Sequence, residues 1–122
     1  MQAVGLLAER GQMKASDLAA ALDASPAFMP QVIGPLVKAG WVRSEPGPTG
    51  GYVLDGAASS ISVLDVVEAV DGPTDSGRCV VADRPCGRSP ECALHGAWAR
   101  ARGELMASLR NIAACDAAAA AP

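Results

Sequence analysis

Residues 38–54 read KAGWVRSEPGPTGGYVL. The stretch holds two short strand candidates, residues 41–44 and residues 52–54, on either side of a segment rich in glycine and proline. Short runs of strand-forming residues separated by such a turn-rich segment predict a β-hairpin. We therefore expect two strands joined by a tip at residues 45–51.

Two short helices are predicted immediately before this hairpin. Residues 15–22, ASDLAAAL, place their larger apolar side chains on one helical face. Residues 25–40, SPAFMPQVIGPLVKAG, begin with Ser25 as an N-cap and Pro26 in the first helical position. Gly40 suits the C-terminal cap of this second helix. A tight turn joins the two helices.

The order helix, turn, helix and hairpin is typical of a winged helix-turn-helix. A further helix is predicted over residues 2–9, ahead of the motif. A small helical domain that carries a surface hairpin is the alternative that this order leaves open.

The rest of the chain divides into segments of different character. A helix over residues 62–70 begins with Ser62 and Asp65, which form an approximate capping box. The expected organisation is a winged helix-turn-helix domain at residues 1–55, a linker helix segment at 56–76, a cysteine-rich loop at 77–92, a long helix at 93–115 and a disordered tail at 116–122. The predicted fold class is mainly α with a small β-hairpin wing.

The long helix carries one narrow apolar seam, whose members are spaced by three or four residues. The seam consists of Leu94, Trp98, Ala101, Leu105, Leu109 and Ile112. A seam of this kind needs a partner, which is either the core of the same chain or the same helix of a second subunit.

Composition and charge narrow the function classes. The 122 residues have a net charge of −3, so charge alone does not predict nucleic-acid binding. No signal peptide and no membrane-length apolar run is visible, so we expect a cytoplasmic protein without a membrane partner, in which thiols stay reduced. No glycine-rich phosphate loop or paired carboxylates accompany the single histidine, so an enzyme is not predicted.

A cluster of thiols lies between the two C-terminal helices. Residues 78–98 read RCVVADRPCGRSPECALHGAW, with the spacing Cys79-x6-Cys86-x5-Cys92-x2-His95. The absence of close CxxC pairs argues against a structural zinc knuckle and against dithiol redox chemistry. Wide spacing in a loop rich in glycine and proline suits an iron–sulfur cluster. Buried thiols, a zinc site and bare redox thiols stay open as alternatives.

The chain resembles a known family, the IscR/NsrR-type winged-helix transcriptional regulators, also called the Rrf-two family. The resemblance runs from Ala3 to about Ile112. It is carried by residues 38–54, by ISVLDVVEAVDGP at residues 61–73, and by CALHGAW at residues 92–98. The resemblance implies a homodimer that binds a palindromic operator in double-stranded DNA, with the long helix as its dimerisation helix.

The same resemblance implies a cofactor. Cys79, Cys86 and Cys92 match the family's three cluster-ligating cysteines, and His95 matches the fourth ligand of the IscR type. A [2Fe–2S] cluster is favoured if His95 is a ligand, and a [4Fe–4S] cluster is the other candidate. The cluster would sense redox state, nitric oxide or iron–sulfur status.

In a winged helix the N-terminal end of the second motif helix enters the major groove, while the wing lies along the backbone or minor groove. Gln31 is the only side chain at that end able to read a base edge bidentately, with a preference for adenine. The expected DNA-binding residues are Ser25, Pro26, Ala27, Phe28 and Gln31 on the helix, and Arg43, Gly47, Thr49, Gly50 and Gly51 on the wing.

Several features depart from the family pattern. The chain starts inside the first family helix, and the recognition helix contains Pro30 and Pro35, the second of which is expected to kink it. Pro46 occupies the position of the wing's usual arginine. The alternatives are therefore a regulator that binds zinc or uses cluster-free thiols, and a degenerate protein-interaction module that no longer binds DNA.

Overall fold

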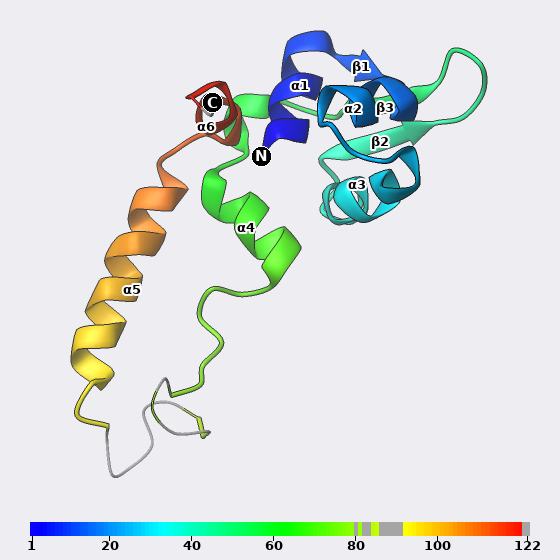
Figure 1. Ribbon diagram of the computed structural model, residues 1–122. Helices are drawn as coiled ribbons and strands as arrows, with labels where there is room; N and C mark the ends of the chain where they lie inside the picture. The colour runs from blue at the N-terminus through cyan, green and yellow to red at the C-terminus, as the bar shows by residue number, and fades with distance from the viewer. Residues whose placement is uncertain (80, 82–83, 86–91, 121–122) are drawn as a thin grey trace.

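The computed structural model describes residues 1–79, 81, 84–85 and 92–120. Its elements in chain order are α1 (Gln2–Arg10), β1 (Gln12–Met13), α2 (Ala15–Ala21), the 3-10 helix η1 (Pro26–Phe28), α3 (Met29–Lys38), β2 (Val42–Glu45), β3 (Gly51–Leu54), the 3-10 helix η2 (Ala58–Ser60), α4 (Val63–Asp71), α5 (His95–Arg110) and α6 (Ala114–Ala120). In Figure 1, α1 to α3 and the strands gather at one end, α4 and α5 extend away from it, and α6 returns beside α1. The predicted mainly α winged-helix fold is confirmed.

The sheet has three antiparallel strands in the order β1-β3-β2. The predicted hairpin is confirmed, with Val42 opposite Leu54 and Glu45 opposite Gly51. Strand β1 was not predicted, because two residues are too few to show an alternating pattern. It pairs with β3 and places Gln12 opposite Val53, so the strand that leads into α2 is joined to the wing.

The second motif helix differs from its prediction. Instead of one helix from Ser25, a 3-10 turn over Pro26–Phe28 precedes α3. Ser25 has extended backbone, but its hydroxyl caps no backbone N–H. Pro30 lies in the first turn of α3, where its missing N–H has no partner to lose. The helix ends as predicted, since the N–H of Gly40 donates to Val37 and that of Trp41 to Leu36.

One core joins the winged-helix elements to the end of the chain. Leu7, Leu18, Met29 and Ile33 are fully buried and bring together α1, α2 and α3. Ala114, at the start of α6, is buried in the same cluster. The winged-helix end of the molecule therefore includes a C-terminal helix. Among the described residues, no helix is both long and apolar enough to cross a membrane.

The C-terminal half of the chain agrees with its prediction at the start of α4 and departs from it at the end of α5. The capping box is present at α4, since Asp65 N–H donates to Ser62 Oγ at 3.1 Å and Ser62 N–H donates to Asp65 Oδ2 at 2.9 Å. The helix predicted for residues 93–115 ends at Arg110, however, and the predicted disordered tail forms most of α6.

Backbone pairing causes this break in the helix. Val63 N–H donates to the Ile112 carbonyl at 2.8 Å, and Ala114 N–H donates to the Ile61 carbonyl at 2.8 Å. These bonds require bridge-like backbone at residues 112–114, which interrupts the helical ladder. The alanine-rich stretch then forms α6, because alanine has the highest helix propensity and a small side chain suits close packing on α1.

Candidate functional site

The first part of the cysteine-rich loop folds back on itself around Cys79. This residue is half-buried, and its backbone N–H donates to the Arg84 carbonyl at 2.9 Å beside a bridge between Arg78 and Pro85. The Cys79 Sγ atom accepts the backbone N–H of Val81 at 3.4 Å. The backbone of Cys79 is thus held by Arg84, and its thiol is held by the backbone N–H of Val81.

The last cysteine of the loop is held at the start of α5. Cys92 is half-buried, and its Sγ atom accepts the backbone N–H of Leu94 at 3.4 Å. Its carbonyl accepts the N–H of His95, the first residue of α5, at 2.9 Å. The structure thus brings Cys92 and His95 together on one turn.

The donor chemistry of these residues fits a soft metal centre. The sulfur atoms of Cys79 and Cys92 each have a backbone N–H directed at them, and thiolate is the form of cysteine that binds iron or zinc. Cys86, the third predicted ligand, lies outside the described residues. Within the described ranges, no three His, Cys, Asp or Glu side chains gather in a group that could hold a metal ion.

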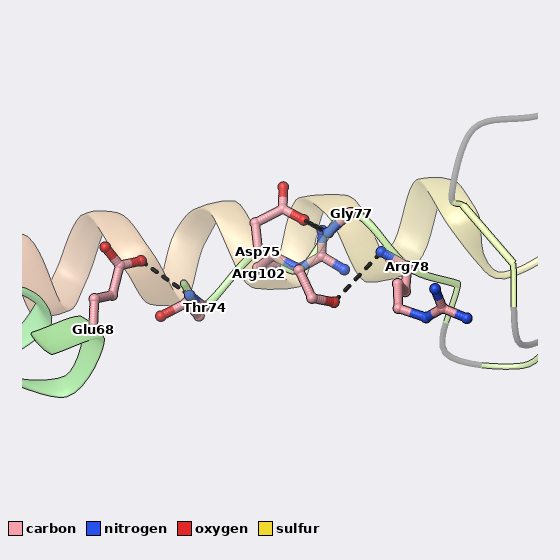
Figure 2. Close-up of polar contacts among 7 residues, drawn as sticks. Glu68, Thr74, Asp75, Gly77, Arg78 and Arg102 are labelled. Carbon is pink, nitrogen blue, oxygen red and sulfur yellow. Dashed lines mark hydrogen bonds and ion pairs between the residues drawn. The ribbon is translucent and has the colours of Figure 1, made fainter. Parts of the chain in front are cut away.

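A polar network ties the segment before Cys79 to both neighbouring helices (Figure 2). From α4, the Glu68 carboxylate accepts the N–H of Thr74 at 3.1 Å. From α5, Arg102 Nη1 donates to Asp75 Oδ1 at 2.9 Å, and the same oxygen accepts the N–H of Gly77 at 3.0 Å. The Arg102 side chain is only 16% exposed, whereas that of Asp75 is 54% exposed.

This network was not predicted from the sequence. The Asp-Ser-Gly run at residues 75–77 is a local turn signal that predicts the Asp75 bond to Gly77. Nothing in the sequence pairs Asp75 with Arg102, because that contact depends on how α5 packs beside the segment.

The predicted DNA-binding side chains of the helix form an exposed face. Ser25, Pro26, Ala27, Phe28 and Gln31 are all exposed on η1 and the start of α3. The opposite face of the helix is buried in the core. This arrangement leaves the N-terminal end of the recognition helix available to a ligand.

The predicted wing residues have different environments. Arg43 is exposed, but its guanidinium lies 3.0 Å from Glu45 Oε1 and 3.6 Å from Asp55 Oδ1. Thr49 and Gly47 are exposed in the loop, where Gly47 has a φ of +99°. Gly50 is buried, and the backbone of Glu45 leaves no room for a side chain there.

The Gly51 position also excludes a side chain. Its φ is +147°, and a Cβ there would collide with the Met13 carbonyl. The two adjacent glycines therefore let β3 pack closely between β1 and β2. Their structural role in the wing is clear from these contacts.

The seam on α5 is not covered by the described part of the chain. Leu94, Trp98, Leu105 and Ile112 are 51%, 48%, 53% and 44% exposed. Ala101 is exposed and Leu109 is half-buried, and α5 has no buried residue. Contiguous exposed apolar side chains of this kind mark an interaction surface.

A family model matches nearly the whole chain. The family described as "Rrf2: Iron-dependent Transcriptional regulator" matches residues 1–119. The chain is 35% identical over 109 residues to the HTH-type transcriptional regulator IscR of Escherichia coli (strain K12 / DH10B). That match covers 89% of this chain and 67% of the relative.

Solved structures share the fold. CymR, the global cysteine regulator of B. subtilis, superimposes with a TM-score of 0.73 at 23% identity, over 98% of this chain and 92% of that one. IscR of T. potens superimposes with a TM-score of 0.67 at 24% identity, over 91% and 74% of the two chains. At these identities the structural likeness establishes the fold alone.

Proposed function

The chain belongs to the Rrf2 family of transcriptional regulators, and from this premise we propose that it is a cytoplasmic homodimer whose DNA binding is controlled by an iron–sulfur cluster. Its relatives regulate transcription, so the chain is a regulator and not an enzyme. Cys79, Cys86 and Cys92 would hold the cluster, with His95 as the fourth ligand. Double-stranded DNA with a palindromic operator would be the partner.

One observation carries the cluster proposal. Both described loop cysteines accept a backbone N–H from the residue two positions ahead, at 3.4 Å in each case. Such bonds stabilise sulfur in its thiolate form and, in iron–sulfur proteins, contribute to setting the reduction potential. A bound cluster would supply an inorganic centre that oxygen, nitric oxide or iron shortage can alter.

The residues of the chain can transmit the state of the loop. The segment that leads into the loop is tied to α4 through Glu68 and to α5 through Arg102, and the last cysteine of the loop lies at the start of α5. A change in the conformation of the loop would therefore change how α4 and α5 pack together. A change in DNA affinity of about 1.4 kcal/mol between loop states is sufficient for a tenfold change in affinity.

The exposed faces of the chain are consistent with a dimer that binds two half-sites in DNA. The exposed residues of η1 and α3 would enter the major groove, with Gln31 at a base edge. The uncovered α5 seam would join two copies by a two-fold axis, and an operator read by such a dimer is palindromic.

The test is anaerobic purification followed by an absorption spectrum and counts of iron, sulfide and zinc. Wild type, Cys86→Ala and Cys115→Ala are compared, because Cys115 lies outside the loop and serves as the matched control. We expect coloured protein with equal iron and sulfide in wild type and Cys115→Ala, and loss of both in Cys86→Ala.

The cluster proposal is wrong if wild type stays colourless after reconstitution with iron and sulfide. Zinc without sulfide, lost in Cys86→Ala, would then identify a zinc-bound regulator. Neither metal nor sulfide would leave a thiol sensor, for which reversible oxidation of the loop cysteines is the next measurement.

A further inference from the structure

The winged-helix region has few cations available for DNA. Its four basic residues are Arg10, Lys14, Lys38 and Arg43, and the loop at residues 46–50 has no charged side chain. Arg43 lies between Glu45 and Asp55, so much of its charge is already compensated. Because affinity for DNA comes largely from cations placed at phosphates, the wing itself supplies little of the required attraction.

Two of the other cations line one hollow beside the wing. The hollow has a volume of about 300 Å³ and lies where the end of α1 and the start of α2 meet the β2–β3 loop. Its lining consists of Arg10, Gln12, Met13, Lys14, Asp17, Thr49 and Gly50. Arg10 and Lys14 are exposed, and neither side chain makes a hydrogen bond or ion pair within the described residues.

The walls of the hollow are fixed by backbone structure. Strand β1 pairs with β3, and Gln12 Nε2 donates to the Thr49 carbonyl at 3.0 Å. The close approach of Gly51 to Met13 holds the wing against β1. Arg10 and Lys14 therefore flank a preformed surface. In Figure 1 the β2–β3 loop extends from the sheet on the side away from α4 and α5.

We propose that this hollow, with Arg10 and Lys14 on its rim, seats a phosphate of the DNA backbone next to the wing. In a helix-turn-helix the first motif helix crosses the backbone, and Lys14 immediately precedes that helix here. A guanidinium and an ammonium are the side chains that bind phosphate best. Asp17 on the same lining reduces the net charge to +1, which limits affinity and offers a test.

This phosphate site rests on the proposed DNA-binding function, so the experiment is chosen to distinguish a failure of the site from a failure of DNA binding itself. Anisotropy of a labelled random-sequence duplex of about 30 base pairs is measured against salt concentration, since phosphate contacts set the salt slope. The variants are Lys14→Gln, Arg10→Gln and Lys14→Arg, with Arg110→Gln as a control that removes one charge from the end of α5.

In a dimer each lost phosphate contact is counted twice. The slope of log K against log salt should therefore become less negative by about 1.8 in Lys14→Gln and in Arg10→Gln. Lys14→Arg and Arg110→Gln should keep the wild-type slope, and Asp17→Asn should bind more tightly. If wild type binds the duplex but the slope is unchanged in both Gln variants, the phosphate site is wrong while the proposed DNA binding stands. A wild type that binds no duplex overturns the phosphate site together with the proposed function.

Discussion

Arg102 and Asp75 lie 27 positions apart in the chain, yet Arg102 Nη1 is 2.9 Å from Asp75 Oδ1. The pair joins the middle of α5 to the segment that leads into the cysteine-rich loop. Because Asp75 also accepts the N–H of Gly77, one carboxylate shapes the turn and fixes it to the helix. This relationship makes α5 part of the loop's support.

Removing either partner should loosen the start of the loop. In Asp75→Asn and in Arg102→Gln we expect faster amide hydrogen exchange at residues 74–79 and faster loss of bound iron to a chelator. The effect on global stability should be about 1 kcal/mol or less, because Asp75 is more than half exposed and solvent screens the pair.

Arg100→Gln is the matched control for this pair, since Arg100 lies on the same helix and makes no ion pair within the described residues. A double-mutant cycle isolates the coupling between Asp75 and Arg102. Strictly additive effects, together with unchanged hydrogen exchange, would show that the contact does not support the loop.

Docking of α6 on α1 depends on a glycine. A Cβ at Gly5 would lie 2.6 Å from the Ala118 Cβ, whereas a Cβ at Gly103 on α5 would meet nothing within 4 Å. Both substitutions to alanine gain helix propensity of about 1 kcal/mol, but only Gly5→Ala must also push α6 away. We expect Gly103→Ala to raise the melting temperature, and we expect the melting temperature of Gly5→Ala to be clearly lower than that of Gly103→Ala. Equal melting temperatures of the two variants would contradict the close packing.

The capping box should contribute measurably to stability. Ser62 is buried, and its hydroxyl and backbone N–H both bond to Asp65. Ser62→Ala should lower the free energy of unfolding by about 1 kcal/mol, as measured by urea denaturation. Ser108→Ala, on the exposed surface of α5, should change it by less than about 0.5 kcal/mol. Equal losses in the two variants would argue against a specific cap.

Self-association should require the exposed seam on α5. Leu105→Glu places a charge in the middle of the seam and should weaken the dimer at least tenfold, a cost of about 1.4 kcal/mol or more. Ala107→Glu, an exposed position off the seam, should leave the dimer intact. Analytical ultracentrifugation measures both, and a wild type that sediments as a monomer at micromolar concentration would rule out the proposed homodimer.

Local signals predicted much of the winged-helix end. The hairpin tip, the Gly40 cap and the Ser62 capping box each depend on hydrogen bonds between residues close in sequence, so the residue types are sufficient to indicate them. The resemblance of residues 38–54, 61–73 and 92–98, in that order, indicated the family to which the chain belongs.

Contacts between distant residues could not be predicted in this way. Residues 112–114 leave the helical pattern because their backbone pairs with residues 61–63. The alanine-rich end, whose low complexity suggested disorder, becomes helical because it packs on α1.

Residue types and short-range spacing were therefore sufficient to predict the order of helices and hairpin in the winged domain, the thiols of the loop and the apolar seam. Tertiary packing, in contrast, joins β1 to the wing, brings Arg102 to Asp75 and places Arg10 and Lys14 beside one hollow. These features depend on how distant segments pack, and a linear pattern does not encode which side chains meet across that packing.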